Sequence, residues 1–495
     1  MHTANPANPL KDSRIGNLDE TAYNGSWVED EVTGAKEAIF SEGRLERLRK
    51  AVDDGTARSL SWRLAQLDGL LHFVGDHESA MLAALRADLG RCAAEARVAD
   101  ITMVRSEIQL IRRNLRQWLR PRPVHTPLAA QPGRSWIQQE PFGLALILGT
   151  WNYPFQQILM PLAGALAAGN AAVVKLSEIA PHSASLMATH LERYVDPAAV
   201  IVVEGGPETA ARLLELRFDK IFFTGQSRVG RIVMTAAAAH LTPVTLELGG
   251  KNPAIVAEDS PLEITARRIV WGRFMNAGQI CVAPDYVLVP EPLRLPFLSA
   301  VQRAITRFYG PDPQRSQSYG RIVNERHFAR LLSLMREGRI AVGGQSDEAD
   351  RYIAPTVLTD LPSHAAVLQE EIFGPILPVV GYHEMEEALS FVRQRPRPLA
   401  LYLFTGNRRL QQRVICEMSS GSVVVNDVVI NQVVPGLPFG GVGNSGMGAF
   451  HGRYTFDAFS REKAVMRRSL HADVDVRYPP FTDLKDRLLR WLLSR

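Results

Sequence analysis

The chain alternates short apolar runs with helical patterns between residues 142 and 246, and this alternation constrains its fold more than any other feature. The apolar runs are continuous, which predicts strands buried on both faces. Such strands separated by helices predict an α/β fold with a doubly wound parallel sheet. The predicted strands are Phe142–Leu148, Ala171–Val174, Ala199–Val203, Lys220–Phe223 and Val244–Leu246, and the predicted helices are Phe155–Ala168, Ser183–Tyr194, Glu208–Leu216 and Ser227–His240.

Ligands of these sheets bind outside the carboxyl ends of the strands. Four segments occupy those ends: Gly149–Tyr153, Lys175–Glu178, Gly205–Gly206 and Thr224–Gly230. A second α/β stretch follows from Ile255 to about Ile430, with predicted helices Leu262–Asn276 and Leu295–Phe308 around a predicted strand Tyr286–Val289.

The chain before the first sheet divides into two parts. Residues 1–36 are polar and aperiodic, which predicts a mobile arm, and helical patterns then run from Glu37 to Arg120. One helix has an apolar stripe with arginines on its other side. A solvated face is favoured there over a nucleic-acid surface, because no aromatic residues are interleaved. The stripe is Val104, Ile108, Ile111, Leu115 and Trp118, and the arginines are Arg105, Arg112, Arg113 and Arg116.

Composition excludes several classes of protein. Apolar residues make up 46% and charged residues 22%, as in ordinary globular proteins, and the net charge of +4 is weak evidence for a polyanionic partner. We therefore expect no nucleic-acid partner. Three cysteines cannot form a disulfide framework, which favours a reducing, cytoplasmic location. No signal-peptide pattern and no apolar stretch of about 20 residues is present, so we expect no membrane span.

Cys281 is the strongest candidate for a nucleophile. It lies in FMNAGQICVAPD, after a helical run and among glycine and polar neighbours, a setting that exposes a thiol. The alternative is an inert small apolar residue, and we favour that interpretation for Cys92 and Cys416.

Two further residues have positions suited to catalysis. Glu247 ends a predicted strand before a double glycine in TLELGGKNP, where a carboxylate can act as a general base, although a structural role is also open. Asn152 in GTWNYPF follows another strand, where its amide can donate to an oxyanion or simply stabilise a turn.

Three pairs of residues are candidates for binding a cofactor. Gly225 and Gly230 in FFTGQSRVG lie between a strand and a helix, where backbone N–H groups can hold a pyrophosphate. Lys175 and Glu178 follow another strand and can hold a ribose diol, or form a solvated ion pair. Glu371 and Phe373 in QEEIFGP lie two apart on a predicted strand, hence on one side of it. No spacing of metal ligands is present.

Seven motifs follow one another along the chain: WNYP, KLSE, TGQSRVG, ELGGKNP, GQICVAPD, EEIFGP and LPFGGVGNSGMG. Taken together and in this order, they resemble the NAD(P)-dependent aldehyde dehydrogenase superfamily, and the sequence around them is similar to its class 3 branch. That branch includes fatty-aldehyde, aromatic-aldehyde and coniferyl-aldehyde dehydrogenases. The similarity covers roughly residues 40 to 480.

The resemblance implies a catalytic role for three residues. Cys281 corresponds to the nucleophile that forms a thiohemiacetal. Asn152 and the backbone N–H of Cys281 correspond to the oxyanion site, and Glu247 to the base that activates the deacylating water.

The resemblance also implies a binding site for NAD, with NADP as the alternative. Lys175 and Glu178 correspond to contacts with the adenosine ribose, and a carboxylate at Glu178 would repel a 2′-phosphate, which favours NAD. Gly225 and Gly230 correspond to the pyrophosphate turn. Glu371 corresponds to the contact with the nicotinamide ribose, beside which Phe373 packs.

Two residues depart from the usual motifs, Leu176 in KLSE and Gln226 in the phosphate turn. Gln226 leaves the backbone contacts possible but puts a side-chain phosphate contact in doubt. Tyr153 and Phe439 are candidates for an apolar wall around an aliphatic long-chain or aromatic aldehyde, coniferyl-type aldehydes included. A CoA-acylating enzyme and a non-catalytic binding protein are the alternative classes, and intact Cys281, Asn152 and Glu247 argue against the latter.

The implied architecture combines a cofactor domain, a catalytic domain and an oligomerisation arm that predicts a homodimer. A C-terminal amphipathic helix would cover the substrate entrance, with weak peripheral membrane contact or packing on the core as alternatives. Its apolar stripe is Phe481, Leu484, Leu488 and Trp491–Leu492. The expected segments are 37–120 and 141–246 for the cofactor domain, 247–456 for the catalytic domain, 121–140 and 457–480 for the arm, and 481–495 for the helix.

Overall fold

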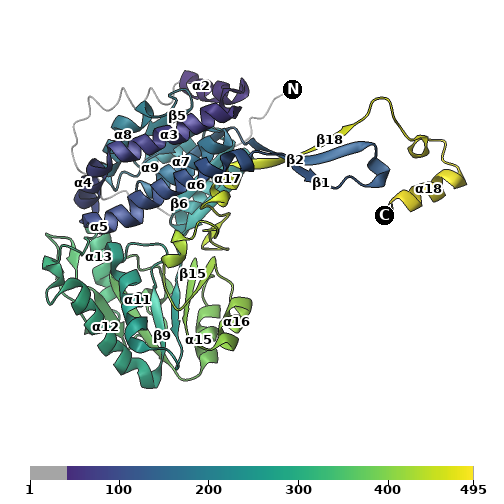
Figure 1. The fold of residues 1–495 in the computed structure, drawn as a ribbon. Coiled ribbons are helices and arrows are strands. Elements are labelled where there is room, and N and C mark those ends of the chain that lie inside the picture. The colour runs from purple at the N-terminus through teal and green to yellow at the C-terminus, as the bar shows by residue number, and fades with distance from the viewer. Residues whose placement is uncertain (1–41, 494–495) are drawn as a thin grey trace, which may run out of the picture. The chain divides into compact units, whose positions relative to one another are not determined.

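The computed structural model describes residues 42–493, so the arm predicted at residues 1–36 lies outside the described residues. Contacts divide the chain after Leu45, and residues 46–495 form one compact unit. Helix α2 (Glu42–Asp53) begins the described part of the chain. Both large sheets lie in the unit that begins at Glu46 (Figure 1).

The apolar runs between residues 142 and 246 form the predicted parallel sheet. Its strands are β3 (Leu144–Leu148), β4 (Ala171–Lys175), β5 (Val200–Val203), β6 (Lys220–Gly225) and β7 (Val244–Leu248), in the order β7-β6-β3-β4-β5. A short strand from much later in the chain, β17 (Gly446–Met447), pairs antiparallel with β7. Connections leave β3 and β6 in opposite directions, which places the topological switch point at their carboxyl ends.

Helices bury this sheet as the alternation predicts. Helix α7 (Gln156–Ala168) packs on β3 and β4, while α3 (Leu60–Asp76) and α6 (Met103–Trp118) pack on α7 from outside (Figure 1). Every residue of α7 is therefore buried. The remaining helices of this region are α4 (Glu78–Leu89), α5 (Ala93–Ala96), α8 (Pro181–His190), α9 (Pro207–Leu214) and α10 (Ser227–Ala238).

The stripe predicted on α6 lies in the core. Val104, Ile108, Ile111 and Leu115 are fully buried, and Trp118 packs partly buried against them. On the other side of the helix, Arg105 pairs with Glu78 and Arg112 with Asp68. These pairs agree with a solvated face.

A second sheet contains seven strands in the order β10-β13-β14-β9-β8-β15-β16, parallel except for the pair β10 and β13. Its strands are β8 (Pro253–Val256), β9 (Tyr286–Pro290), β10 (Arg339–Val342), β13 (Thr356–Thr359), β14 (Ile376–Tyr382), β15 (Ala400–Phe404) and β16 (Ser422–Val425). A small hairpin pairs β11 (Ser346–Asp347) with β12 (Tyr352–Ile353). The helices are α11 (Leu262–Phe274), α12 (Arg294–Tyr309), α13 (Glu325–Met335), α14 (Ala366–Gln369), α15 (Met385–Arg393), α16 (Arg408–Glu417) and α17 (Arg453–Ala458).

Two local predictions were wrong. The strand expected around Glu371 and Phe373 is a loop between α14 and β14, because Phe373 has a φ of +50° that a strand cannot accommodate. The helix expected to reach Asn276 ends at Phe274, because Asn276 and Ala277 adopt left-handed conformations.

The two segments predicted as an arm pair with each other. Strand β2 (Gly133–Pro141) lies between β1 (Arg122–Val124) and β18 (Ser460–Arg468), both antiparallel to it. The part this sheet plays in dimerisation stays a prediction.

The C-terminal helix is confirmed as α18 (Asp483–Leu493). It contacts two single 3₁₀ turns of its own chain, Leu128–Ala130 and Asp475–Arg477. Phe481, Leu484 and Leu488 remain 63%, 66% and 43% exposed, while the side chain of Leu492 lies outside the described part. Between residues 42 and 493, no helix combines the length and apolar character needed to cross a membrane.

Candidate active site

The predicted site residues lie at carboxyl ends of strands in the first sheet and at amino ends of strands in the second sheet. Asn152 follows β3, and Gly225 ends β6, so both lie at the switch point of the first sheet. Cys281 precedes β9, and Glu371 precedes β14, at the amino ends of the second sheet. Glu247 belongs to β7, from which Gly249 and Gly250 lead directly to β8.

The Cys281 loop is held in a strained conformation. Asn276, Ala277 and Gly278 all have positive φ, and a side chain at Gly278 would collide with the carbonyl of Gly374. Asn252 stabilises the loop, since its Nδ2 donates to the carbonyl oxygen of Cys281 at 2.8 Å. The thiol therefore sits on a fixed backbone.

The Cys281 thiol lies near two carboxylates. Burial raises its pKa, and the charges of Glu371 and Glu247 raise this pKa further, while the backbone N–H groups of Cys281 and Val282 lower it. The thiol is therefore protonated at neutral pH in this state, and a base must take its proton before the sulfur can attack.

The side chain of Asn152 is buried beside this loop. Its Nδ2 donates to the carbonyl oxygen of Gln279 at 3.0 Å, two residues before Cys281. Asn276 donates in turn to the carbonyl oxygen of Asn152 at 3.1 Å. An amide nitrogen carries two hydrogens, so Asn152 keeps one for a further acceptor.

Glu247 is buried in the middle of three strands. It pairs with Thr224 of β6 on one side and Gly446 of β17 on the other, and only 3% of it is exposed. Neither of its carboxylate oxygens has a hydrogen-bond partner in the described part of the chain. Burial raises its pKa well above the usual value, so the ionised form is a stronger base than a surface glutamate.

The first two cofactor candidates lie at the carboxyl ends of the first sheet. Nζ of Lys175 donates to the carboxylate of Glu178 at 2.7 Å. The lysine side chain is only 7% exposed, so the solvated ion pair that was the alternative does not describe Lys175. At the turn after β6, the first bond of α10 runs from the N–H of Gly230 to the carbonyl of Gln226, and Gln226 does not cap the helix. Gly230 also lets α10 approach Leu248 closely.

Glu371 lies against the linker between the sheets, and Phe373 packs on a residue that follows β3. A side chain at Gly249 would collide with the carboxylate of Glu371, which accepts the N–H of Gly250. Burial and the charge of Asp285 raise the pKa of Glu371 to about 8, and its Oε1 has no partner within residues 42–493. The ring of Phe373 meets that of Trp151 edge-on at 5.2 Å.

These features fit an NAD(P) molecule. Backbone N–H groups of a helix N-terminus suit a pyrophosphate, and the buried unpartnered oxygen of Glu371 suits a ribose hydroxyl. No group of three or more His, Cys, Asp or Glu side chains in the described residues is placed to hold a metal ion.

The two candidates for the substrate wall are both buried. Tyr153 is 5% exposed and has the guanidinium of Arg91 at 4.6 Å from its ring centre. Phe439 is 7% exposed and stacks on His451 at 5.0 Å.

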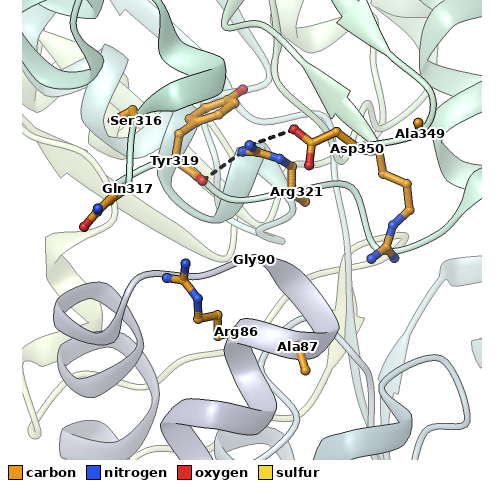
Figure 2. A pocket seen from close by; sticks show the side chains of 10 residues that line it. Arg86, Ala87, Gly90, Ser316, Gln317, Tyr319, Arg321, Ala349 and Asp350 are labelled. Carbon is orange, nitrogen blue, oxygen red and sulfur yellow. Dashed lines mark hydrogen bonds and ion pairs between the residues drawn. The ribbon is translucent and has the colours of Figure 1, made fainter.

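A polar hollow of about 300 Å³ lies elsewhere, between the end of α4 and the loop around Arg321 (Figure 2). Arg321 pairs there with Asp350 at 2.9 Å. None of the predicted site residues lines this hollow.

Sequence reasoning missed the residues that fix these loops. Asp285 is buried and pairs with Lys251 at 2.6 Å and with Arg273 at 2.9 Å, and it also accepts the N–H of Ile372 next to Glu371. Asn252 likewise holds the backbone of Cys281, because its Nδ2 donates to the carbonyl oxygen of that residue. Lys251, Asn252 and Asp285 lie inside the motifs ELGGKNP and GQICVAPD. The signal that could have identified them is a charged or amide side chain directly before a fully apolar strand, where it is expected to be buried and paired.

Comparison with known proteins identifies the class. Residues 43–465 match the family model described as aldehyde dehydrogenase family. Aldehyde dehydrogenase family 3 member B1 of Rattus norvegicus is 48% identical over 450 residues, covering 90% of this chain and 96% of the relative. Family 3 member H1 of Arabidopsis thaliana is 45% identical over 452 residues, covering 90% and 93%.

Solved structures agree with the sequence relatives. The substrate-bound state of Staphylococcus aureus AldH has a TM-score of 0.89 and 42% identity, covering 91% of this chain and 99% of that one. An aldehyde dehydrogenase of Mycobacterium tuberculosis complexed with NAD+ has a TM-score of 0.77 and 26% identity, covering 87% and 90%.

This chain therefore belongs to the aldehyde dehydrogenase family, and the class 3 resemblance is confirmed. It is an NAD(P)-dependent oxidoreductase that converts an aldehyde to the carboxylic acid.

Proposed function

We propose that this enzyme oxidises long-chain apolar aldehydes through a covalent intermediate on Cys281. The observation that carries the chemistry is the meeting of Asn152, Glu247 and Glu371 around the loop of that thiol. The Cys281 thiol passes its proton to the carboxylate of Glu247, which releases it to solvent, and the sulfur attacks the aldehyde carbon to give a thiohemiacetal oxyanion.

The oxyanion is stabilised by fixed donors. The second amide hydrogen of Asn152 and the backbone N–H of Cys281 are the donors, because the bond from Asn152 to Gln279 already fixes the amide beside the Cys281 loop. Preorganised donors of this kind contribute about 3 kcal/mol each to lowering the barrier.

The cofactor, when bound, supplies the hydride acceptor that turns the thiohemiacetal into a thioester. Lys175, Glu178 and the N-terminus of α10 would hold its adenosine and pyrophosphate parts. Glu371 and Phe373 would hold its nicotinamide end.

Glu247 then resolves the thioester. As a carboxylate it takes a proton from a water, whose oxygen attacks the thioester carbon. The carbon–sulfur bond then breaks, and the proton held by Glu247 passes to the Cys281 sulfur, which regenerates both the thiol and the carboxylate. The product is the free acid. The buried base Glu247 supports water as the acceptor of the acyl group. It argues against the CoA-acylating alternative, which needs no base to activate water.

The substrate class is tested by comparing aldehydes of increasing chain length with NAD and with NADP. We expect kcat/KM to rise from propanal to dodecanal by at least about 10-fold, because each buried methylene adds roughly 0.8 kcal/mol of binding. A higher kcat/KM for coniferyl aldehyde than for dodecanal would favour the aromatic alternative. Equal values for all aldehydes would contradict an apolar pocket.

The tail supports the same substrate class. The exposed apolar side chains of Phe481, Leu484 and Leu488 face no core of their own chain, so plain core packing is disfavoured. We propose that the chain is a homodimer joined through the β1-β2-β18 sheet, in which α18 covers the partner's substrate entrance. Weak contact with a membrane surface is a secondary role of the same stripe.

Deleting residues 481–495 is expected to lower kcat/KM for dodecanal about 10-fold more than for propanal, because only the long chain would touch the apolar stripe. The double variant Leu484→Gln, Leu488→Gln should have the same selective effect with the helix intact. Arg490→Gln, on the charged side of α18, is the matched control. Equal losses for both aldehydes would refute the role of the tail, and a lower melting temperature would favour packing on its own chain.

A further inference from the structure

A buried charge cluster lies behind the catalytic loops and takes no part in the reaction above. Arg91 donates from Nε to Glu95 at 3.2 Å and lies 3.4 Å through Nη1 from Asp100. The side chains of Arg91 and Asp100 are completely buried, and that of Glu95 is 17% exposed. Buried charges cost free energy, so a cluster of three needs a reason beyond stability.

The cluster occupies a single short segment of chain. Arg91 follows Gly90, the residue that ends α4, and Glu95 belongs to the one-turn helix α5. Asp100 belongs to the π-helical turn Arg97–Thr102, and such turns are found frequently at functional sites. We call these three residues the brace.

Each carboxylate of the brace holds the backbone of a different catalytic loop. Asp100 Oδ1 accepts the N–H of Gln156 at 2.7 Å, at the start of α7 and four residues after Asn152. Glu95 Oε1 accepts the N–H of Asn276 at 3.1 Å, where the strained turn before Cys281 begins. The brace thus joins two loops that lie more than 100 residues apart in the sequence.

The two loops meet again at the oxyanion site itself. Asn152 and Asn276 both donate from Nδ2 to the carbonyl oxygen of Gln279, at 3.0 and 3.3 Å. Displacement of either loop would therefore move the amide of Asn152 relative to Cys281.

A third contact ties the same segment to the loop of Arg321. The N–H of Arg321 donates to the carbonyl of Leu89 at 2.8 Å, and Gly90 faces Arg321 so closely that a side chain there would collide with it (Figure 2). The carbonyl of Arg321 accepts Nε2 of Gln279 at 2.9 Å. Gln279 is thus fixed through both its carbonyl and its side chain.

We propose that Arg91, Glu95 and Asp100 are positioning residues that set the distance between the Asn152 amide and the Cys281 thiol. Burial raises the pKa of Glu95 and raises that of Asp100 to about 7, and the charge of Arg91 opposes both shifts. Arg91 also aligns the two carboxylates, and its guanidinium lies over Tyr153, the residue next to Asn152. This inference rests on the proposed role of Asn152 as an oxyanion donor.

The test is a double-mutant cycle between Asp100→Asn and Asn152→Ala in the full-length enzyme, with kcat measured at saturating cofactor and dodecanal. Asp100→Asn alone is expected to lower kcat about 10-fold, because small displacements of positioned groups are costly. In the Asn152→Ala background the same change should lower kcat less than about 2-fold, since the donor that it positions is gone. KM for NAD should not change.

Asp88→Asn is the matched control. Asp88, near the end of α4, is also a buried aspartate that caps the start of another helix, because it accepts the N–H groups of His182 and Ser183 of α8 at 3.0 and 2.9 Å. It has no hydrogen bond with either catalytic loop among the described residues. It should lower the melting temperature as much as Asp100→Asn without an effect on kcat at saturating cofactor. Arg91→Lys should retain more of kcat than Arg91→Met, and Glu95→Gln replaces Asp100→Asn if the latter does not fold.

Two results would contradict the proposals, and each contradicts a different one. If Asn152→Ala leaves kcat unchanged, the proposed oxyanion role of Asn152 is wrong. If Asn152→Ala lowers kcat but Asp100→Asn lowers it by the same factor in both backgrounds, the brace acts independently of Asn152 and the inference is overturned.

Discussion

Replacing Cys281 with alanine is expected to abolish aldehyde oxidation while NAD binding persists. The thiol is the proposed attacking atom, and the left-handed turn at Asn276, Ala277 and Gly278 fixes the backbone that carries it. Loss of a covalent nucleophile should lower kcat at least about 1,000-fold. The measurement is NADH formation at saturating dodecanal, with NAD binding followed by calorimetry.

The other cysteines provide the controls for this variant. Cys416 is exposed on α16, and Cys92 accepts the N–H of Glu95 at the start of α5, so neither is placed to attack a substrate. Cys416→Ala should keep full activity. A Cys281→Ala enzyme that retains a tenth or more of wild-type kcat would show that another group forms the intermediate.

Glu247→Gln is expected to slow hydrolysis of the thioester more than its formation. Removal of a general base should lower the steady-state rate about 100-fold, while the first turnover stays fast, so rapid mixing should reveal a burst of NADH. Because burial raises the pKa of Glu247, the wild-type deacylation rate should increase as pH rises and the carboxylate ionises. The variant should lack that dependence.

Glu107→Gln is the matched control, because it makes the same change from glutamate to glutamine at another buried position. Glu107 is a buried glutamate that accepts the N–H of Gly452 at 2.8 Å, remote from Cys281 in the hydrogen-bond network. The Glu107→Gln enzyme should show no burst of NADH, and the pH dependence of its deacylation rate should be unchanged. A Glu247→Gln enzyme without a burst and with a normal steady-state rate would exclude Glu247 as the base.

Much of the fold follows from sequence because the relevant signals are local. The strands β3–β7 are continuous apolar runs, and the structure places them within a few residues of their predicted bounds. Helix α6 follows from the spacing of its stripe. The positive φ of Phe373 could not be predicted, because EEIFGP has strand-like composition and the residue that its ring contacts, Trp151, lies far away in the sequence.

The site was predictable only in part, for a geometric reason. The carboxyl-end rule identifies Asn152 and Gly225, but Cys281 and Glu371 lie at amino ends of the second sheet. The glycine and polar neighbours of Cys281 in the sequence indicate its role instead. Asp285 and the brace escaped notice because their partners come from distant segments, and no single stretch of sequence contains both halves of such a contact. The roles of all the site residues stay predictions until the variants are measured.

The strand order has a consequence for biosynthesis. Strand β7 receives its outer neighbour β17, and β2 its neighbour β18, only from the last part of the chain. About 200 residues separate Leu248 from Gly446, so at roughly 5–20 residues per second a ribosome needs about 10–40 s to supply the missing strands. For that interval β7 of the first sheet and β2 of the three-stranded sheet each have an open edge, which can pair with other nascent chains. The yield of soluble enzyme should therefore depend on translation speed and on chaperones that shield those edges.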